Sequence, residues 1–188
     1  MLIQRLLAAC GWGTLLLLLA STAPAQSFPV IPEFQLYQSV GTRGSMYTTG
    51  AAGFAIHLFD EGGGDPGLYL QLLVLRSPKS FLGFASQIGG LKPLEDGSGY
   101  EIGLHNRWSE VSRKAASLTY RNLEWKSVMV DGVAGPSAKA EVLHLGWSWT
   151  TWDTYPVVWL LGLDLASLKL PKNSGGEAQL ALGIRTGF

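Results

Sequence analysis

The chain contains little cysteine and little charge, and each shortage excludes a class of protein. Of its 188 residues only Cys10 is a cysteine, which excludes a disulfide framework or a zinc site built from several cysteines. Charged residues make up 15%, and 14 basic side chains balance 14 acidic ones. This balance argues against nucleic-acid binding, because phosphates require a basic face. Apolar residues are abundant, at 47%, so the chain can bury enough surface to fold as one ordered domain.

Residues 1–25 have the layout of a secretory signal peptide. Arg5 places a positive charge near the start, five leucines follow at 15–19, and an A-x-A cleavage site stands at 23–25. Cleavage after this site would leave a chain without cysteine. An L-A-A-C box at 7–10 offers lipoprotein-type processing as an alternative, but it would leave the leucine run on the mature protein.

After residue 25, apolar residues recur at every second position, which is typical of β-strands. The last segment is the clearest, since Leu180, Leu182 and Ile184 share one face and Gln179 and Arg185 share the other. Such segments pair an apolar face with a face of small and polar residues. Eight strands are predicted, at residues 47–59, 68–76, 80–89, 99–108, 115–128, 142–149, 159–166 and 179–188.

Long and short connections alternate between these segments. The tight connections are 77–79 and 153–155, and the longer ones, rich in glycine, proline and aspartate, are 60–67, 90–98, 129–137 and 171–176. A meander of this kind has long loops at one end and short turns at the other, as outer-membrane barrels do. The sequence therefore predicts an all-β fold, an up-and-down antiparallel transmembrane β-barrel of about eight strands.

Aromatic residues fall into two groups under this topology. The group expected toward the short turns comprises Tyr47, Phe81, Phe84, Trp108, Trp147, Trp149, Trp152, Trp159 and Phe188, and the opposite group comprises Phe59, Tyr69, Tyr100 and Trp125. Amphipathic rings sit at both membrane interfaces of such barrels. We therefore expect two aromatic girdles; the alternative is that these tryptophans fill a soluble core.

The C-terminal residues 181–188, Ala-Leu-Gly-Ile-Arg-Thr-Gly-Phe, resemble the terminal signature of outer-membrane β-barrel proteins. Phe188 and Gly183 match that signature, and Thr186 stands where a bulkier apolar residue is commoner. In the family, the barrel-assembly machinery reads this signature, so the resemblance implies that these three residues are an assembly signal. Residues 47–188 resemble a small eight-stranded barrel of the OmpA or OmpX size class. The resemblance implies a location in the outer membrane, in contact with its lipid and lipopolysaccharide.

A more local stretch resembles lipid A palmitoyltransferase, another family of small barrels. The likeness rests on Gly-Ala-Ala-Gly-Phe at 50–54, Asp-Glu at 60–61 and Gly-Leu-Tyr at 67–69. It would imply a catalytic histidine on the first strand and an Asp-Ser pair after the third. Residues 35–50 contain no histidine, and Arg-Ser at 76–77 occupies the place of Asp-Ser. No catalytic residue is therefore carried over.

Residues 26–46 are predicted to be an N-terminal extension or an extra strand. Phe34, Leu36, Gln38 and Val40 occupy alternate positions, in the manner of a ninth strand. An odd number of strands is unusual in bacterial outer-membrane barrels. Either this segment is a periplasmic or plugging extension, or two of the later strands are miscounted.

Charged residues lie on the faces opposite the leucines, which we expect to point inward. A hairpin centred on Thr154 sets His144 opposite Asp164 and brings Arg185 near them. An Asp-oriented His144 with Ser148 as nucleophile is the catalytic alternative, but the two lie roughly 13 Å apart along one strand. A salt-bridge network is favoured, because an eight-stranded interior is only just wide enough for side chains. The expected network comprises His144, Asp164, Arg185, Glu101, His105 and Arg107, with Gln179, Asn122, Glu124 and Lys126 as further inward residues.

Neither a metal site nor a cofactor site is predicted. His57, His105 and His144 stand on three different strands without an i, i+2 ligand pair. The glycine run at 62–64 is not followed by the Lys-Ser/Thr of a phosphate-binding loop.

Three functions are weighed. The favoured one is a small integral outer-membrane barrel with a structural or interaction role, in contact with lipid, lipopolysaccharide and the barrel-assembly machinery. The second is an outer-leaflet enzyme that acts on lipid A acyl chains through His144 or His105. The third is a soluble lipocalin-like binder of an apolar ligand, which requires the leucine-rich faces to point inward. A diffusion pore is disfavoured because eight strands leave no open channel.

Overall fold

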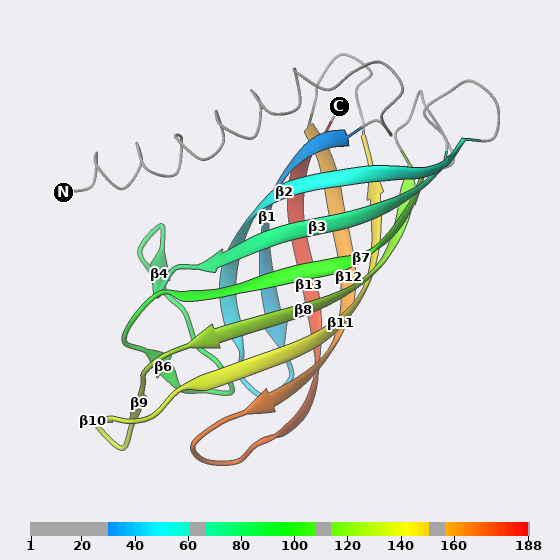
Figure 1. Ribbon diagram of the computed structural model, residues 1–188. Coiled ribbons are helices and arrows are strands. Elements are labelled where there is room, and N and C mark those ends of the chain that lie inside the picture. The colour runs from blue at the N-terminus through cyan, green and yellow to red at the C-terminus, as the bar shows by residue number, and fades with distance from the viewer. Residues whose placement is uncertain (1–29, 61–66, 108–113, 151–156, 188) are drawn as a thin grey trace.

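Eight long strands close into an antiparallel barrel in the computed structural model, which describes residues 30–60, 67–107, 114–150 and 157–187 (Figure 1). Each long strand pairs with the next one along the chain, and the first closes the barrel against the last. The predicted all-β fold of eight antiparallel strands is confirmed. The barrel strands are β1 (Val30–Gly41), β2 (Met46–Asp60), β3 (Gly67–Ser77), β7 (Gly97–Arg107), β8 (Ala115–Trp125), β11 (Ala138–Trp149), β12 (Val157–Lys169) and β13 (Gly175–Gly187).

Five short strands of the described residues lie outside the barrel wall. They are β4 (Ser80–Phe81), β5 (Phe84–Ala85), β6 (Lys92–Pro93), β9 (Val128–Val130) and β10 (Val133–Ala134). β4 pairs with β5, whereas β9 pairs with both β6 and β10. The described residues include no helix that could span a membrane.

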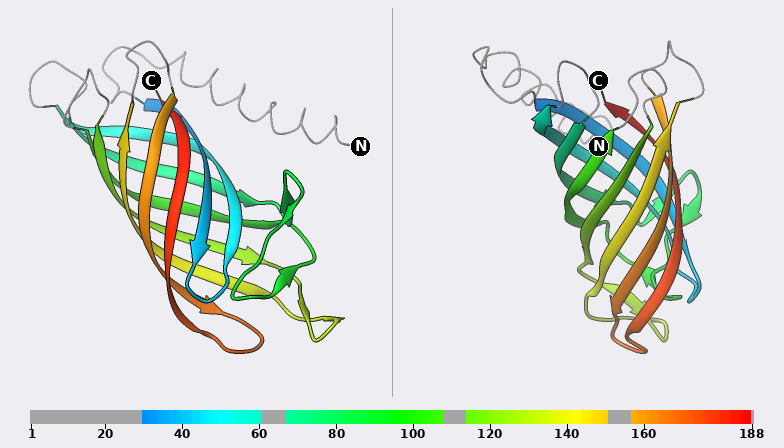
Figure 2. Two further views of the ribbon diagram at one scale, coloured as in Figure 1. Left: turned by 180° about the vertical axis from the view of Figure 1, so that it is seen from behind. Right: turned by 90° about the vertical axis from the view of Figure 1, so that its right-hand side faces the viewer.

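The two ends of the barrel differ in their connections. β1 begins and β13 ends at the same end, here called the termini end, where the strands are joined by 61–66, 108–114 and 150–156. The opposite end, here called the loop end, carries the connections 42–45, 78–96, 126–137 and 170–174. All five short strands belong to the two longest of these connections. Figure 2 shows them gathered around the loop end.

The barrel begins earlier in the chain than the sequence predicted. Residues 26–46, expected as an extension or an extra strand, contain β1, and the barrel therefore starts at Val30 and not at residue 47. β1 pairs along its length with both β2 and β13. The alternation that suggested a ninth strand was thus a true barrel strand.

Residues 80–89, expected as a barrel strand, do not enter the wall. The chain turns back at Leu82 and Gly83, whose φ angles of 49° and 85° are left-handed, and β4 pairs with β5. One barrel strand was left out and one was added, so the predicted number of eight is still correct. The connections before residue 80, however, lie at the opposite end of the barrel from the one predicted. Residues 60–67, expected among the long loops, consequently lie at the termini end.

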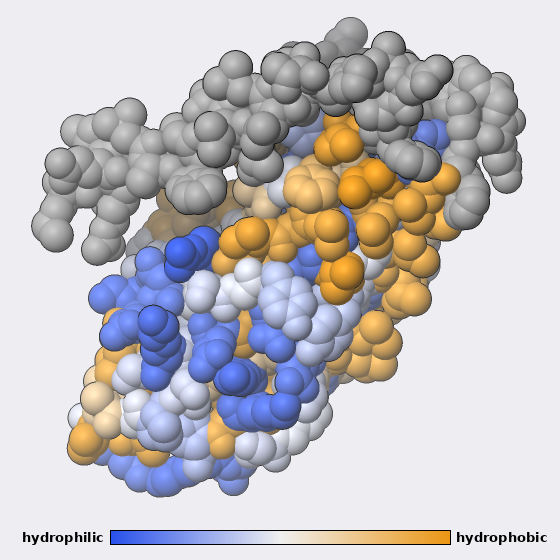
Figure 3. All heavy atoms as spheres, in the orientation of Figure 1, coloured by the Kyte–Doolittle hydropathy of each residue, from blue (hydrophilic) through white to orange (hydrophobic). Residues whose placement is uncertain are grey.

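Side chains alternate across the barrel wall, and the outward face is apolar along much of its height. Leu143, Leu145, Leu163 and Leu165 point outward and are 42% to 66% exposed. Figure 3 shows apolar residues gathered nearer the termini end and hydrophilic residues nearer the loop end. The lipocalin-like alternative requires the reverse orientation of these leucine-rich faces, and is therefore not supported by β11 and β12.

The expected aromatic girdles are only partly present. Tyr47, Tyr69 and Trp125 point into the barrel, where each is at most 2% exposed, so their assignment to a girdle was wrong. Phe81 and Phe84 belong to the β4–β5 hairpin outside the wall, and Trp108, Trp152 and Phe188 lie outside the described residues. Exposed aromatic side chains lie toward the termini end at Phe34, Trp147, Trp149 and Trp159. Tyr100 of the opposite group is also exposed, and it lies beside Tyr120 nearer the loop end, as predicted.

The barrel interior changes character along its length. Toward the loop end it is an apolar core, formed by Tyr47, Ala51, Leu73, Leu75, Ile88, Leu123, Trp125, Val128, Ala138, Ala140, Val142, Ala166, Leu168 and Leu170. In this core Trp125 packs edge-on against Tyr47, with ring centroids 5.3 Å apart. Midway along the barrel and toward the termini end, buried charged and polar side chains take over. The candidate functional residues lie in this polar half.

Candidate functional site

Arg121 is the centre of the first buried cluster. Its Nε donates to Glu101 Oε2 at 2.7 Å and its Nη1 donates to Asp164 Oδ2 at 3.2 Å. The guanidinium also lies over the ring of Tyr37, 4.2 Å from its centroid, and Gln71 donates to the other oxygen of Glu101 at 3.2 Å. All of these side chains are buried. One cation on β8 thus joins Glu101, its direct cross-strand neighbour on β7, to Asp164 on β12, two strands away in the wall.

His144 completes this cluster from β11. It lies directly opposite Asp164, which confirms the predicted register, and its Nδ1 is hydrogen-bonded to Asp164 Oδ1. The imidazole occupies space left free by two glycines. A Cβ on Gly162 would lie 2.0 Å from His144 Cε1, and one on Gly146 would lie 2.4 Å from its Nε2. Packing and hydrogen bonding together hold the ring in one orientation.

A second cluster surrounds Arg185 on β13. Arg185 Nη1 lies 3.5 Å from Glu33 Oε1 and donates to the ring of His105 at 3.0 Å. Gln35 donates to the same oxygen of Glu33 at 3.1 Å. The expected convergence of Arg185 on Asp164 is wrong, because Asp164 pairs with Gln179, six residues earlier on β13. Arg121 takes the place that Arg185 was expected to fill.

Aromatic rings extend this second cluster. Arg107 lies over Tyr69 at 4.8 Å from the ring centroid, and His57 stacks on the same ring with centroids 4.6 Å apart. His105 packs at a tilt on Tyr69 as well. Within the described residues, Arg107 Nε, His57 Nε2 and Glu33 Oε2 are buried without a hydrogen-bond partner. This cluster therefore contains polar atoms that its neighbours leave unsatisfied.

Ser148 does not form a catalytic arrangement with His144. Its hydroxyl is buried and has no hydrogen-bond partner among the described residues. The carboxylate that orients His144 is also shared with Arg121. The geometry thus holds His144 and Asp164 inside the barrel without a hydrogen bond between Ser148 and the imidazole. The described residues contain no group of His, Cys, Asp and Glu arranged to hold a metal ion.

The structure places the expected interior residues unevenly. His144, Asp164, Arg185, Glu101, His105, Arg107 and Gln179 are buried inside the barrel. Asn122 and Glu124 instead point outward on β8, and Lys126 is exposed beyond its end. Two further interior residues, Arg121 and Glu33, were not predicted, although they are the partners that hold the two clusters together. Leu118 and Leu123 stand on opposite faces of β8, so the rule that leucines face outward could not orient this strand.

The residues of the expected assembly signal lie on the strand that closes the barrel. Gly183 pairs with Tyr37 of β1, and a Cβ at this glycine would lie 2.6 Å from the Cβ of Tyr37. The close approach of β1 and β13 therefore requires glycine at position 183, whether or not the barrel-assembly machinery recognises this segment. Thr186 pairs with Phe34. Phe188 lies outside the described residues.

Two solved structures resemble this chain at low sequence identity. No protein-family model and no curated protein matches the chain. The crystal structure of Neisserial surface protein A is similar with a TM-score of 0.46 and 12% identity, over 85% of this chain and 96% of that one. The attachment invasion locus protein Ail of Yersinia pestis is similar with a TM-score of 0.36 and 9% identity, over 83% and 95%. At these identities and TM-scores neither likeness adds to the fold described above.

Proposed function

We propose that this protein is a small integral outer-membrane barrel with a structural or interaction role. The observation that carries the proposal is the inverted polarity of its wall, with exposed leucines outside and buried, paired charges inside. Water would force the opposite arrangement on an isolated barrel. In a bilayer the outward leucines contact acyl chains, and the closed barrel leaves no unpaired strand edge.

A change of polarity on β11 and β12 supports a membrane boundary at one level of the wall. Outward positions change from Glu141 and Ser167 to Leu143 and Leu165, which are paired across the two strands. The intervening inward positions change in the opposite sense, from the apolar pair Val142–Ala166 to the polar pair His144–Asp164. The apolar outside therefore begins where the apolar inside ends. We place the boundary between residues 141 and 143.

The loop end would then project from the membrane on the extracellular side. Its two longest connections, 78–96 and 126–137, are longer than those at the termini end, as in outer-membrane barrels. Ion pairs lie on the outer wall at this end, where Lys139 is 3.2 Å from Glu124 and Lys169 is 2.6 Å from Glu141. These charges suit water and the phosphates of lipid or lipopolysaccharide, which we propose as natural contacts.

The filled interior favours a role other than transport. Trp125, Tyr47 and the leucines around them occupy the loop half, and the two arginine clusters occupy the polar half. An eight-stranded barrel filled in this way leaves no aqueous path. A role in presenting the projecting loops to partners fits this interior better. Insertion by the barrel-assembly machinery, through the C-terminal strand, is part of the same proposal.

Membrane fractionation combined with gel mobility tests the proposal. We expect the protein in the outer-membrane fraction, resistant to extraction by salt or alkali, and migrating differently on gels before and after boiling. A barrel reconstituted in a planar bilayer should show no steady conductance. Recovery in the soluble fraction without detergent, or a persistent conductance, would contradict the proposal.

A further inference from the structure

The β4–β5 hairpin lies against the outside of the barrel. β4 contacts β2, and the chain that follows the hairpin is tied to the start of β2 by paired hydrogen bonds between Met46 and Gln87 of 2.8 and 2.7 Å. Thr48, an outward residue of β2, lines the same groove as Phe81 of β4 and is buried. Figures 1 and 2 show β4 beside the wall and nearer the termini end than the sheet of β6, β9 and β10.

The tip of this hairpin is apolar and exposed. Leu82 is 82% exposed and Phe84 is 73% exposed, the two highest values among the large hydrophobic residues described. Burial of such side chains is favourable, and a contiguous exposed group of them marks a contact surface. None of the described residues buries these two side chains.

Comparison with a second hairpin shows that turn formation does not account for Leu82. Both β4–β5 and β9–β10 have two-residue turns with positive φ at both positions, Leu82-Gly83 in one and Asp131-Gly132 in the other. Asp-Gly suits such turns, whereas a leucine in the left-handed region is sterically disfavoured. The backbone at Leu82 thus adopts a conformation that leucine disfavours. Residues in such conformations occur preferentially at functional sites.

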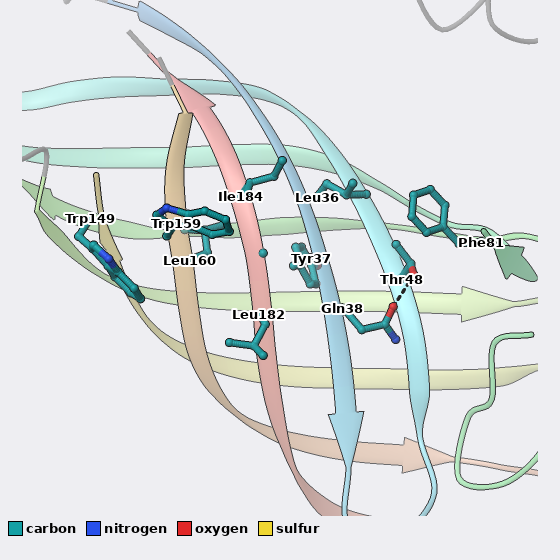
Figure 4. A pocket seen from close by; sticks show the side chains of 11 residues that line it. Leu36, Tyr37, Gln38, Thr48, Phe81, Trp149, Trp159, Leu160, Leu182 and Ile184 are labelled. Atoms are coloured by element: carbon teal, nitrogen blue, oxygen red, sulfur yellow. Dashed lines mark hydrogen bonds between the residues drawn. The ribbon is translucent and has the colours of Figure 1, made fainter. Parts of the chain in front are cut away.

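An apolar groove continues from the hairpin across the outer wall. It has a volume of about 440 Å³ and runs from Phe81 over Leu36 and Leu182 to Trp159 (Figure 4). The two polar side chains at the edge of the groove are hydrogen-bonded to each other, since Thr48 Oγ1 donates to Gln38 Oε1 at 2.5 Å. The hairpin and the outward face proposed to contact lipid therefore form one continuous apolar surface.

Exposed cations stand at the base of the hairpin. Arg76 ends the outward row of β3 and Lys79 directly precedes β4, and both side chains are exposed. Lipid phosphates lie just outside the acyl region, so a cation next to an inserted apolar tip matches the layering of a leaflet.

We propose that the β4–β5 hairpin inserts Leu82 and Phe84 into the leaflet at the loop end, where the groove beside Phe81 holds an acyl chain and Arg76 and Lys79 face lipid phosphates. The inference rests on the proposed outer-membrane function and adds a second, loop-borne contact with lipid. The hairpin is thus a membrane-facing element, whereas the β9–β10 hairpin projects into water.

Environment-sensitive labels on single cysteines test this assignment. Leu82→Cys, Phe84→Cys, Val133→Cys and Leu163→Cys would each be made with Cys10→Ser, so that no other thiol reacts. Val133 is the matched control, since it is 68% exposed and follows the turn of the other hairpin. Leu163 lies on the outward wall and reports insertion of the barrel itself. Each protein is purified from membranes, labelled with a nitrobenzoxadiazole dye and reconstituted in phosphatidylcholine–phosphatidylglycerol vesicles containing brominated acyl chains.

We expect a blue-shifted emission at Leu82 and Phe84, and quenching by brominated lipid at least roughly threefold stronger than at Val133. Strong quenching at Leu163 with solvent-like emission at both hairpin sites would overturn the hairpin proposal alone. Absence of quenching at Leu163 would overturn the membrane function and the hairpin proposal with it. An unquenched label at Leu82, together with disulfide-linked dimers of the unlabelled Leu82→Cys protein after oxidation with copper phenanthroline and oxygen, would assign the surface to a second copy of the chain instead of lipid.

Discussion

The two halves of this barrel are filled by opposite kinds of side chain. In the loop half, Trp125, Leu123 and Leu168 pack in an apolar core inside a wall that carries ion pairs outside. In the other half, Arg121 and Arg185 organise buried charges inside a wall that exposes leucines. The polarity of the inner face and that of the outer face thus both reverse at about the same level of β11 and β12.

With the proposed membrane location, this difference follows from the force that holds each half together. A wall surrounded by water gains free energy when apolar side chains leave the solvent, so its core is apolar. A wall surrounded by lipid gains nothing from moving leucines inward, because acyl chains are as apolar as leucine. Hydrogen bonds and ion pairs then specify the interior, and they are stable only if each buried charge is paired. Glu101 and Asp164 meet this condition through Arg121.

Removing Arg121 is expected to give the largest effect, since it breaks the polar half at its centre. Arg121→Leu leaves Glu101 and Asp164 buried without their cation, and we expect a loss of about 4 kcal/mol in the free energy of unfolding. The measurement is urea unfolding of the reconstituted barrel, followed by tryptophan fluorescence and by gel mobility without boiling.

Two comparison variants decide what that loss means. Lys139→Ala removes a half-exposed ion pair with Glu124 on the outer wall and should cost at most about 1 kcal/mol. Neutralising the whole cluster, by Glu101→Gln, Arg121→Met and Asp164→Asn together, should cost less than Arg121→Leu alone, because no buried charge is then left unpaired. A loss for Arg121→Leu as small as that for Lys139→Ala would show that the cluster does not stabilise this half.

The same contrast explains how far the sequence could be interpreted. On β11 and β12 the tight hairpin and the outward leucines predicted both the inward faces and the pairing of His144 with Asp164. β8 crosses the level at which polarity reverses. Leu118 points outward on the side of the termini end, whereas Leu123 points inward on the side of the loop end. The rule that leucines face outward therefore cannot orient this strand, and Arg121 was not predicted to be an interior residue. A pattern that assumes one environment along a strand fails where the environment changes.

Strand order was hidden for a different reason. The segment that became β4 and β5 is apolar enough for a barrel strand, and only the left-handed backbone at Leu82 turns it back. Leucine gives no sign of that conformation, because its intrinsic preference is against it. β1 was not assigned to the barrel because residues 80–89 had already been counted among the eight strands. Its pattern is nevertheless that of a barrel strand, since Glu33, Gln35 and Tyr37 point inward and alternate with outward apolar residues.

Shortening Trp125 tests the apolar half. The side chain is fully buried, packs on Tyr47 and lies where a Cβ on Gly97 would come within 2.4 Å of its Nε1. Trp125→Ala should therefore leave a cavity and lower the free energy of unfolding by about 3 kcal/mol. We expect faster protease cleavage in 126–137 while the unboiled gel mobility persists, since the polar half keeps its own contacts. Trp147→Ala, on the outward wall, is the control and should leave cleavage unchanged; equal cleavage of both variants would refute separate stabilisation of the halves.

A methyl group at Gly162 tests whether the polar half is packed as closely as the apolar one. Gly162→Ala would place a Cβ 2.0 Å from His144 Cε1, so the imidazole must leave Asp164, and we expect a loss of about 2 kcal/mol from overpacking. Gly176→Ala is the matched control, because its Cβ would meet only Ala166 O, at 3.8 Å. His144→Ala combined with Gly162→Ala should recover part of the loss, since no ring remains to be displaced. If Gly162→Ala unfolds at the same urea concentration as Gly176→Ala, the imidazole has room to move, and the polar half is held by its charges without close packing.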